Sequence, residues 1–93
     1  MINARHMKRI AQSMTEIFVT DFQENPNYQG RNFSWQTFPE NFAGLISSHI
    51  PTSCLRHEKD LSVFKKSEAR IKRWIKNYAR QLIKARGLNG EAV

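Results

Sequence analysis

The residue types best suited to chemistry gather in one short stretch, HIPTSCLRHEKD at residues 49–60. It holds the only cysteine of the chain, Cys54, and two of its three histidines, His49 and His57. Cys54 and His57 have a Cys-x-x-His spacing, which can place a thiolate and an imidazole on one metal ion. Structural zinc normally takes four such ligands as two pairs, however, and His6 is far away in the sequence. We therefore predict no metal site.

The same pair could support nucleophilic catalysis, because a histidine beside a cysteine can stabilise a reactive thiolate. Such a site also needs an orienting group, oxyanion donors and a substrate cleft. The 93-residue chain has no glycine-rich loop, and its eight acids are scattered along the sequence. The sequence therefore favours a protein that is not an enzyme and has no catalytic residue and no cofactor. Cys54 is then a small buried apolar side chain and His57 a surface residue.

Size and composition predict a single small domain over residues 1–93. With 40% apolar residues the chain can build a core, although a modest one. A lone cysteine cannot form an internal disulfide, which indicates a reducing compartment. The chain lacks a signal-peptide pattern and an apolar run near the roughly 20 residues that span a bilayer. We expect a soluble, intracellular, cytoplasmic protein without a membrane partner, and a homodimer is compatible with so small a core.

The charge balance is more informative about partners. Fifteen Lys and Arg against eight Asp and Glu give a formal net charge of +7. A basic balance of this size on a small folded domain favours polyanionic partners. Simple solubility is the alternative explanation.

Hydrophobic periodicity predicts that residues 3–24 form an amphipathic helix. Asn25-Pro26 ends it, because a residue before proline is disfavoured in the α region. Residues 25–37 are then a loop. An aromatic-rich segment begins in this loop and contains Tyr28, Phe33, Trp35, Phe38 and Phe42. These rings could form a platform on which bases stack, but in so short a chain we favour rings that fill gaps between helices.

Residues 38–64 are predicted to form a helical middle segment. Thr37 and Glu40 have the spacing of a capping box, in which each side chain binds the backbone N–H of the other. Pro51 is predicted to end this helix, and Thr52 or Ser53 to cap a short helix that reaches residue 59. With the flanking helices, this gives a mainly α fold: a small single-core domain of four to five helices with an aromatic-rich loop.

The final helix, residues 66–86, is the most basic element. Its predicted apolar stripe is Ile71, Trp74, Ile75, Tyr78 and Leu82. Cations cover the opposite arc and follow one another at i,i+4 spacing, which costs a few tenths of a kcal/mol per like-charge pair. An external anion would neutralise such a row of cations. Nucleic acid is the favoured anion, followed by an acidic protein surface, whereas a membrane would need the apolar stripe that the core uses.

Residues 45–56, LISSHIPTSCLR, resemble the centre of helix-turn-helix DNA-binding domains. The resemblance implies that Leu45, Ile50 and Leu55 pack together and that the second helix enters the major groove. His49 departs from the pattern, because it stands where these domains typically have a turn glycine and adopts positive φ less readily. We favour an ordinary helix–proline–helix junction over a true helix-turn-helix.

Two sets of binding residues follow. Arginine can bind guanine edges, and serine or threonine can bind phosphate. The candidates for base reading are Thr52, Ser53, Arg56 and His57. The predicted nucleic-acid-binding set is Arg56, Lys59, Lys65, Lys66, Arg70, Lys72, Arg73, Lys76, Arg80 and Lys84.

The sequence thus predicts a small non-enzymatic nucleic-acid-binding protein, with DNA preferred over RNA. Its size suits a regulatory or accessory protein of a bacterium, plasmid or phage. The alternative is a protein-interaction module, an inhibitor or adaptor that docks on an acidic surface of a larger protein.

Overall fold

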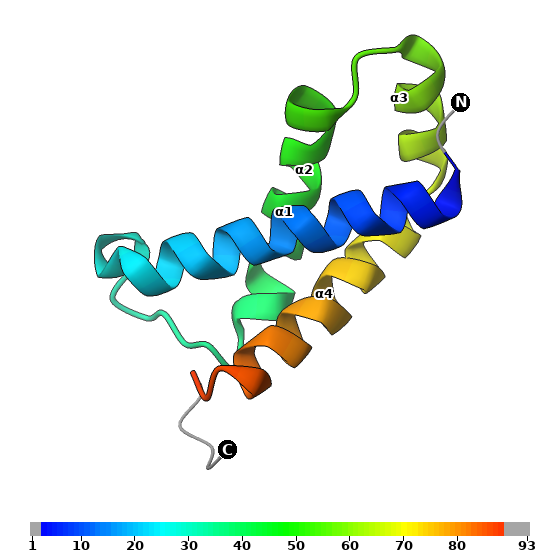
Figure 1. Ribbon diagram of the computed structural model, residues 1–93. Coiled ribbons are helices and arrows are strands. Elements are labelled where there is room, and N and C mark those ends of the chain that lie inside the picture. Colours follow the sequence, from blue (N-terminus) through cyan, green and yellow to red (C-terminus); the bar gives the residue numbers. More distant parts are fainter. Residues whose placement is uncertain (1–2, 89–93) are drawn as a thin grey trace.

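The computed structural model describes residues 3–88, which form four α-helices and no strand (Figure 1). The mainly helical fold with an aromatic cluster is therefore as predicted. In chain order the elements are α1 (Ala4–Glu24), the short 3₁₀ turn η1 (Pro26–Tyr28), α2 (Phe38–Cys54), α3 (Glu58–Lys66) and α4 (Glu68–Ala85).

α1 begins and ends where local chemistry requires it. The side chain of Asn3 accepts a hydrogen bond from the backbone N–H of His6 (2.8 Å), which satisfies one of the free donors of the first turn. At the other end, Asn25 leaves the helical region with φ −124° and ψ 83°, directly before Pro26. The helix can therefore extend no further into the loop.

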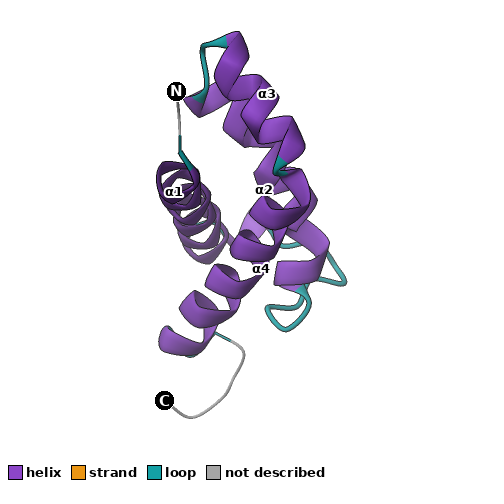
Figure 2. Cartoon of the chain, turned by 90° about the vertical axis from the view of Figure 1, so that its right-hand side faces the viewer, coloured by secondary structure: helices purple, strands orange, loops and turns teal. Residues whose placement is uncertain are grey.

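α4 is the central element of the core, because it packs against both α1 and α2. α1 and α4 run in the same direction (Figure 1). Figure 2, which looks along α1, shows α2 and α4 on one side of it. α1 therefore covers one side of the α2–α4 pair.

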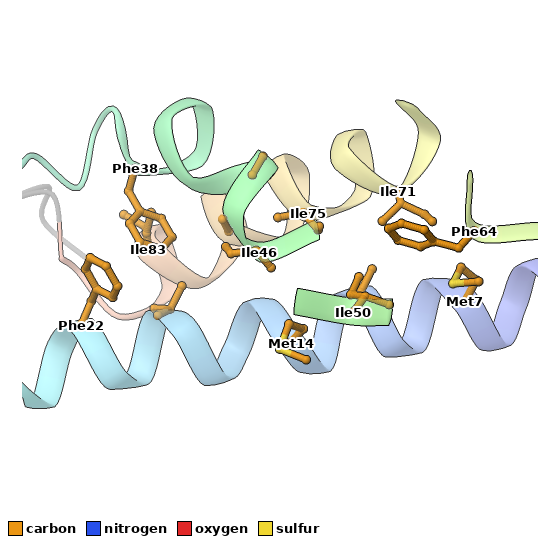
Figure 3. Packing of buried hydrophobic residues seen from close by; sticks show 14 of the residues in the cluster. Met7, Met14, Phe22, Phe38, Ile46, Ile50, Phe64, Ile71, Ile75 and Ile83 are labelled. Carbon is orange, nitrogen blue, oxygen red and sulfur yellow. The ribbon is translucent and has the colours of Figure 1, made fainter. Parts of the chain in front are cut away.

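The buried stripe of α4 differs from the predicted one. It consists of Ile71, Ile75, Ala79 and Ile83, at i,i+4 spacing (Figure 3 shows three of them). The other predicted members, Trp74, Tyr78 and Leu82, are only half-buried. The reason is that α4 contacts α1 and α2 at once, so its buried face is centred between them, and Trp74 and Tyr78 lie on its flank.

The aromatic residues lie where α1 ends and α2 begins, and there they confirm the expectation that they fill the core. Phe38 is fully buried, and its ring lies 4.9–6.2 Å from four other rings: Phe22, Phe33, Trp35 and Phe42. We call these five residues the aromatic end. Tyr28 is the exception, because it is 59% exposed and contacts the cluster only through Phe22 (5.7 Å between ring centroids).

The helix boundaries predicted within residues 45–56 are wrong, and the resemblance to a helix-turn-helix does not hold. α2 continues through Pro51 to Cys54, and α3 begins only at Glu58 with His57 as its N-cap. Pro51 stands in the last turn, where its missing N–H removes a single helical hydrogen bond. The buried side chains of Ile50 and Leu55 on either side hold this turn against the core.

The predicted capping box at the start of α2 is wrong as well. Thr37 is the N-cap, but its hydroxyl donates to the carbonyl of Ser34 (3.3 Å) and accepts from the side chain of Asn41 (3.3 Å). Glu40 does not reach back to Thr37, because its carboxylate binds cations of α4 instead. Tertiary ion pairs here replace a local cap.

Candidate nucleic-acid interface

The predicted cations of α4 occupy its solvent-facing side. Opposite the buried stripe the helix carries Arg70, Arg73, Arg80 and Lys84 as exposed residues, with Lys72 and Lys76 half-buried at its edge. Lys65 and Lys66 are exposed at the end of α3, immediately before α4. This part of the prediction therefore corresponds to a connected run of basic surface.

Internal acids neutralise three of these cations. Lys72 lies 3.9 Å from the carboxylate of Glu68 one turn earlier. Glu40 of α2 binds both Lys76, at 3.2 Å, and Arg80. All of these side chains are substantially exposed, so the pairs contribute little to stability. Their main effect is to lower the positive electrostatic potential around the middle of α4, because the cations there are paired with acids of the same chain.

The remaining cations of this surface have no acid partner among residues 3–88. They are Lys65, Lys66, Arg70, Arg73 and Lys84. Four of them belong to the end of α3 or the beginning of α4. The uncompensated charge is therefore concentrated towards the N-terminal half of α4.

A further cation that the sequence did not single out, Arg86, joins the ends of α4 and α1. Its guanidinium donates to the hydroxyl of Thr20 (3.0 Å) and to the side-chain oxygen of Gln23 (3.2 Å), and it lies 4.0 Å from Glu16. Tyr78 also donates to Glu16 (3.5 Å). These groups bind one another, so we assign Arg86 a structural role.

The candidate base-reading residues lie elsewhere. Thr52 and Ser53 belong to the last turn of α2, where the Thr52 hydroxyl donates to the carbonyl of His49 (3.2 Å). Arg56 and His57 are exposed in the α2–α3 connection, which lies at the far end of α3 from Lys65 and Lys66 (Figure 1). The nine residues of α3 separate the two groups by about 13 Å of helix.

The side-chain set that would support a helix-turn-helix is also incomplete. Ile50 and Leu55 are buried, but Leu45 is 45% exposed. His49 lies within α2, with 5.2 Å between its ring centroid and that of Phe18, and no residue other than glycine among residues 3–88 has a positive φ. The junction is thus the ordinary helix–proline–helix alternative, with the proline inside the first helix.

The cysteine and histidines do not form a reactive centre in the described part of the chain. Cys54 was predicted to be buried but is exposed at the end of α2, because the helix continues one turn past Pro51. Partial desolvation raises the pKa of its thiol, which disfavours the thiolate at neutral pH. Among residues 3–88, the His, Cys, Asp and Glu side chains form no group of three or more that could hold a metal ion.

Two hollows on the surface are each lined by residues of a single helix. The first is lined by Ser13, Glu16, Ile17, Thr20 and Asp21 of α1, and the second by Glu58, Leu61, Ser62, Lys65 and Lys66 of α3. Residues at i,i+3 and i,i+4 spacing on a single helix form a groove between side chains. Neither hollow is therefore a cleft between elements, such as an enzyme uses to enclose a substrate.

Comparison with known proteins adds no relative. No family model matches the chain, and neither a curated protein nor a solved structure is significantly similar to it. Within residues 3–88, none of the helices has the length and apolarity needed to cross a bilayer.

Proposed function

We propose that this chain is a small nucleic-acid-binding protein without enzymatic activity, and that it binds phosphates through the outer surface of α4. The observation that supports this most directly is the set of exposed cations that have no acid partner within residues 3–88, above all Arg70 and Arg73 on α4 and Lys65 and Lys66 beside them. Each phosphate that such a cation neutralises releases condensed counterions, which gives affinity without reading bases.

DNA is preferred over RNA because of where the aromatic rings lie. Sequence-specific RNA binding commonly stacks exposed bases on aromatic side chains. The rings of the aromatic end are packed against one another instead, and Phe38 is fully buried. A protein that contacts backbone phosphates with helix cations suits a duplex, and a regulatory or accessory role suits a domain of this size.

The salt dependence of duplex binding tests the proposal. We expect the logarithm of the association constant, measured by fluorescence anisotropy, to fall linearly with the logarithm of salt concentration, by about 0.9 per neutralised phosphate. The double variant R70Q/R73Q should lower this slope by about one to two and weaken binding at low salt.

A charge-matched control removes two exposed cations from outside α4, in the variant R31Q/K59Q. Both variants have the same net charge, so a difference in affinity between them reports the position of the removed cations. We expect R31Q/K59Q to weaken binding clearly less than R70Q/R73Q. Absence of duplex binding by the unaltered chain at low salt would refute the proposal. An acidic protein recovered as its direct partner would then favour the docking alternative.

A further inference from the structure

The net charge of the chain lies almost entirely at one end of the fold. Three segments meet there, and their cations are Arg5, Lys8 and Arg9 of α1, Lys65 and Lys66 of α3, and Arg70, Lys72 and Arg73 of α4. We call this set the charged end. Glu68 is the one acid within residues 4–9 and 65–73, so these two stretches together carry +7, which equals the net charge of all 93 residues. The first turn of α3 adds Glu58, Lys59 and Asp60 at the far end of that helix. The other seven Lys and Arg are matched in number by the other seven acids.

Core side chains bring these three segments together. Met7 of α1, Phe64 of α3 and Ile71 of α4 are all buried and lie beside one another (Figure 3). Only Ser67 separates the end of α3 from the beginning of α4. Figure 1 shows the start of α1 at this same junction. The cations of the first two turns of α1 therefore lie beside those of α3 and α4, although about 60 residues separate them in the sequence.

The register of the two parallel helices indicates which side these cations occupy. Glu16 contacts Tyr78, and Thr20 contacts Arg86, so these residues mark the partly exposed edge along which α1 and α4 meet. Arg9 lies two turns before Glu16 on the same face of α1. Arg9 therefore extends this edge to the charged end. On α4, Arg70 lies eight residues before Tyr78, so it is about 80° further round the helix, on its exposed side.

The arrangement has an electrostatic cost within the folded chain. The first acid of α1 is Glu16, so nothing in its first three turns offsets the three cations. Arg5 also lies in the first turn, where the positive end of the helix dipole disfavours a cation. Like charges at i,i+4, such as Arg5 and Arg9, repel. An external polyanion would relieve all three effects.

We propose that the charged end, including the beginning of α1, is the surface that binds the phosphate backbone of a nucleic-acid duplex. This inference rests on the proposed function and moves the centre of binding from the whole length of α4 to the junction of α1, α3 and α4. Arg5, Lys8 and Arg9 thereby become binding residues, whereas the Lys76–Arg80 segment, which Glu40 neutralises, becomes peripheral.

The side chains at this end favour a duplex over other polyanions. A single strand is usually held by stacking its bases on exposed aromatic rings. The two rings adjacent to these cations in sequence belong to the core: Phe64 is buried, and Trp74 is half-buried and packed against it. A membrane surface would require exposed apolar residues, and the large ones, Ile17, Tyr28 and Leu45, belong to other parts of the molecule.

The test compares two triple variants that remove the same charge. R5Q/K8Q/R9Q neutralises the beginning of α1, and K76Q/R80Q/K84Q neutralises the second half of α4. We expect the first to weaken binding to a random-sequence DNA duplex at least about ten-fold at low salt and to lower the salt slope by about two to three. The second should weaken binding by no more than about three-fold.

An equal or larger loss in K76Q/R80Q/K84Q would overturn the inference while leaving α4 as the binding helix. If the affinity for the duplex were unchanged in all three variants, R5Q/K8Q/R9Q, R70Q/R73Q and K76Q/R80Q/K84Q, the proposed function itself would be refuted. Glutamine is a good helix former, and circular dichroism would verify that each variant folds.

A second measurement avoids substitutions altogether. Lysine acetylation of the unaltered chain, with and without duplex, should show protection of Lys8, Lys65 and Lys66 and little change at Lys59 and Lys84. The reverse pattern would place the duplex elsewhere and contradict the inference.

Discussion

The aromatic end and the charged end are both assembled from three separate segments, but by opposite means. At the aromatic end, rings from α1, the 25–37 loop and α2 contact one another at centroid distances of 4.9–6.3 Å. At the charged end, buried Met7, Phe64 and Ile71 join the segments, and residues 4–9 and 65–73 carry eight cations and one acid, Glu68. The first end stabilises the fold through the packing of its rings, whereas the like charges of the second oppose folding slightly.

The largest effect should come from removing the central ring of the aromatic end. Phe38→Ala deletes a fully buried side chain that contacts four other rings, so we expect a loss of about 3–5 kcal/mol in the free energy of unfolding. Small domains have about 5–15 kcal/mol in total, so this variant should be close to its folding limit. Urea denaturation followed by circular dichroism measures the change.

The matched control is Tyr28→Ala, which removes an aromatic ring that is 59% exposed and whose one ring contact within residues 3–88 is with Phe22. We expect a loss below about 1 kcal/mol. If the two substitutions were equally destabilising, the aromatic end would not be the packed unit described above.

A smaller effect is expected at the charged end, where Asn3 caps α1. Asn3→Ala removes the acceptor for the N–H of His6 and should cost about 1 kcal/mol. Asn3→Asp keeps an acceptor and places a negative charge beside the helix N-terminus, so it should be at least as stable as the unaltered chain. Thermal denaturation would rank the three proteins, and a destabilised Asn3→Asp would contradict the capping role.

The smallest expected effect is an increase in the free energy of unfolding. Arg9→Gln removes one cation from a surface of like charges, so we expect it to raise the free energy of unfolding by a few tenths of a kcal/mol at low salt. The gain should vanish near 1 M salt, where the Debye length is about 3 Å. Urea denaturation at the two salt concentrations measures both values.

Arg80→Gln provides the comparison, because Arg80 is paired with Glu40 and its removal should bring no gain at either salt concentration. A similar stabilisation by both substitutions would show that the cations of the two regions experience the same potential. The distinction between the charged end and the rest of α4 would then disappear.

The sequence was sufficient for features that depend on local spacing. The 3.6-residue recurrence of apolar side chains predicts α1 and α4, and Asn25-Pro26 marks the end of α1. The density of aromatic residues near residues 28–42 was enough to favour core packing, because so short a chain has few other large side chains to bury. The excess of cations on α4 was also visible without coordinates.

Other features required the positions of distant residues. Pro51 looks like a helix end, but the burial of Ile50 and Leu55 carries α2 one turn further, and this removes the predicted turn at His49. Glu40 looks like half of a capping box, but two cations of α4 compete for its carboxylate and bind it. A local pattern fails in both places because a tertiary contact offers a better partner.

The sequence by itself determined the composition of this protein: a helical chain with one basic helix, a run of aromatic residues and an excess of seven positive charges. Only the tertiary structure decided where that excess lies. The beginning of α1 reads as an ordinary solvated face until Met7 packs against Phe64 and Ile71, which places its cations beside those of α3 and α4. Burial acts through side chains that are distant in the sequence, so the charged surface above them could not be predicted from spacing along the chain.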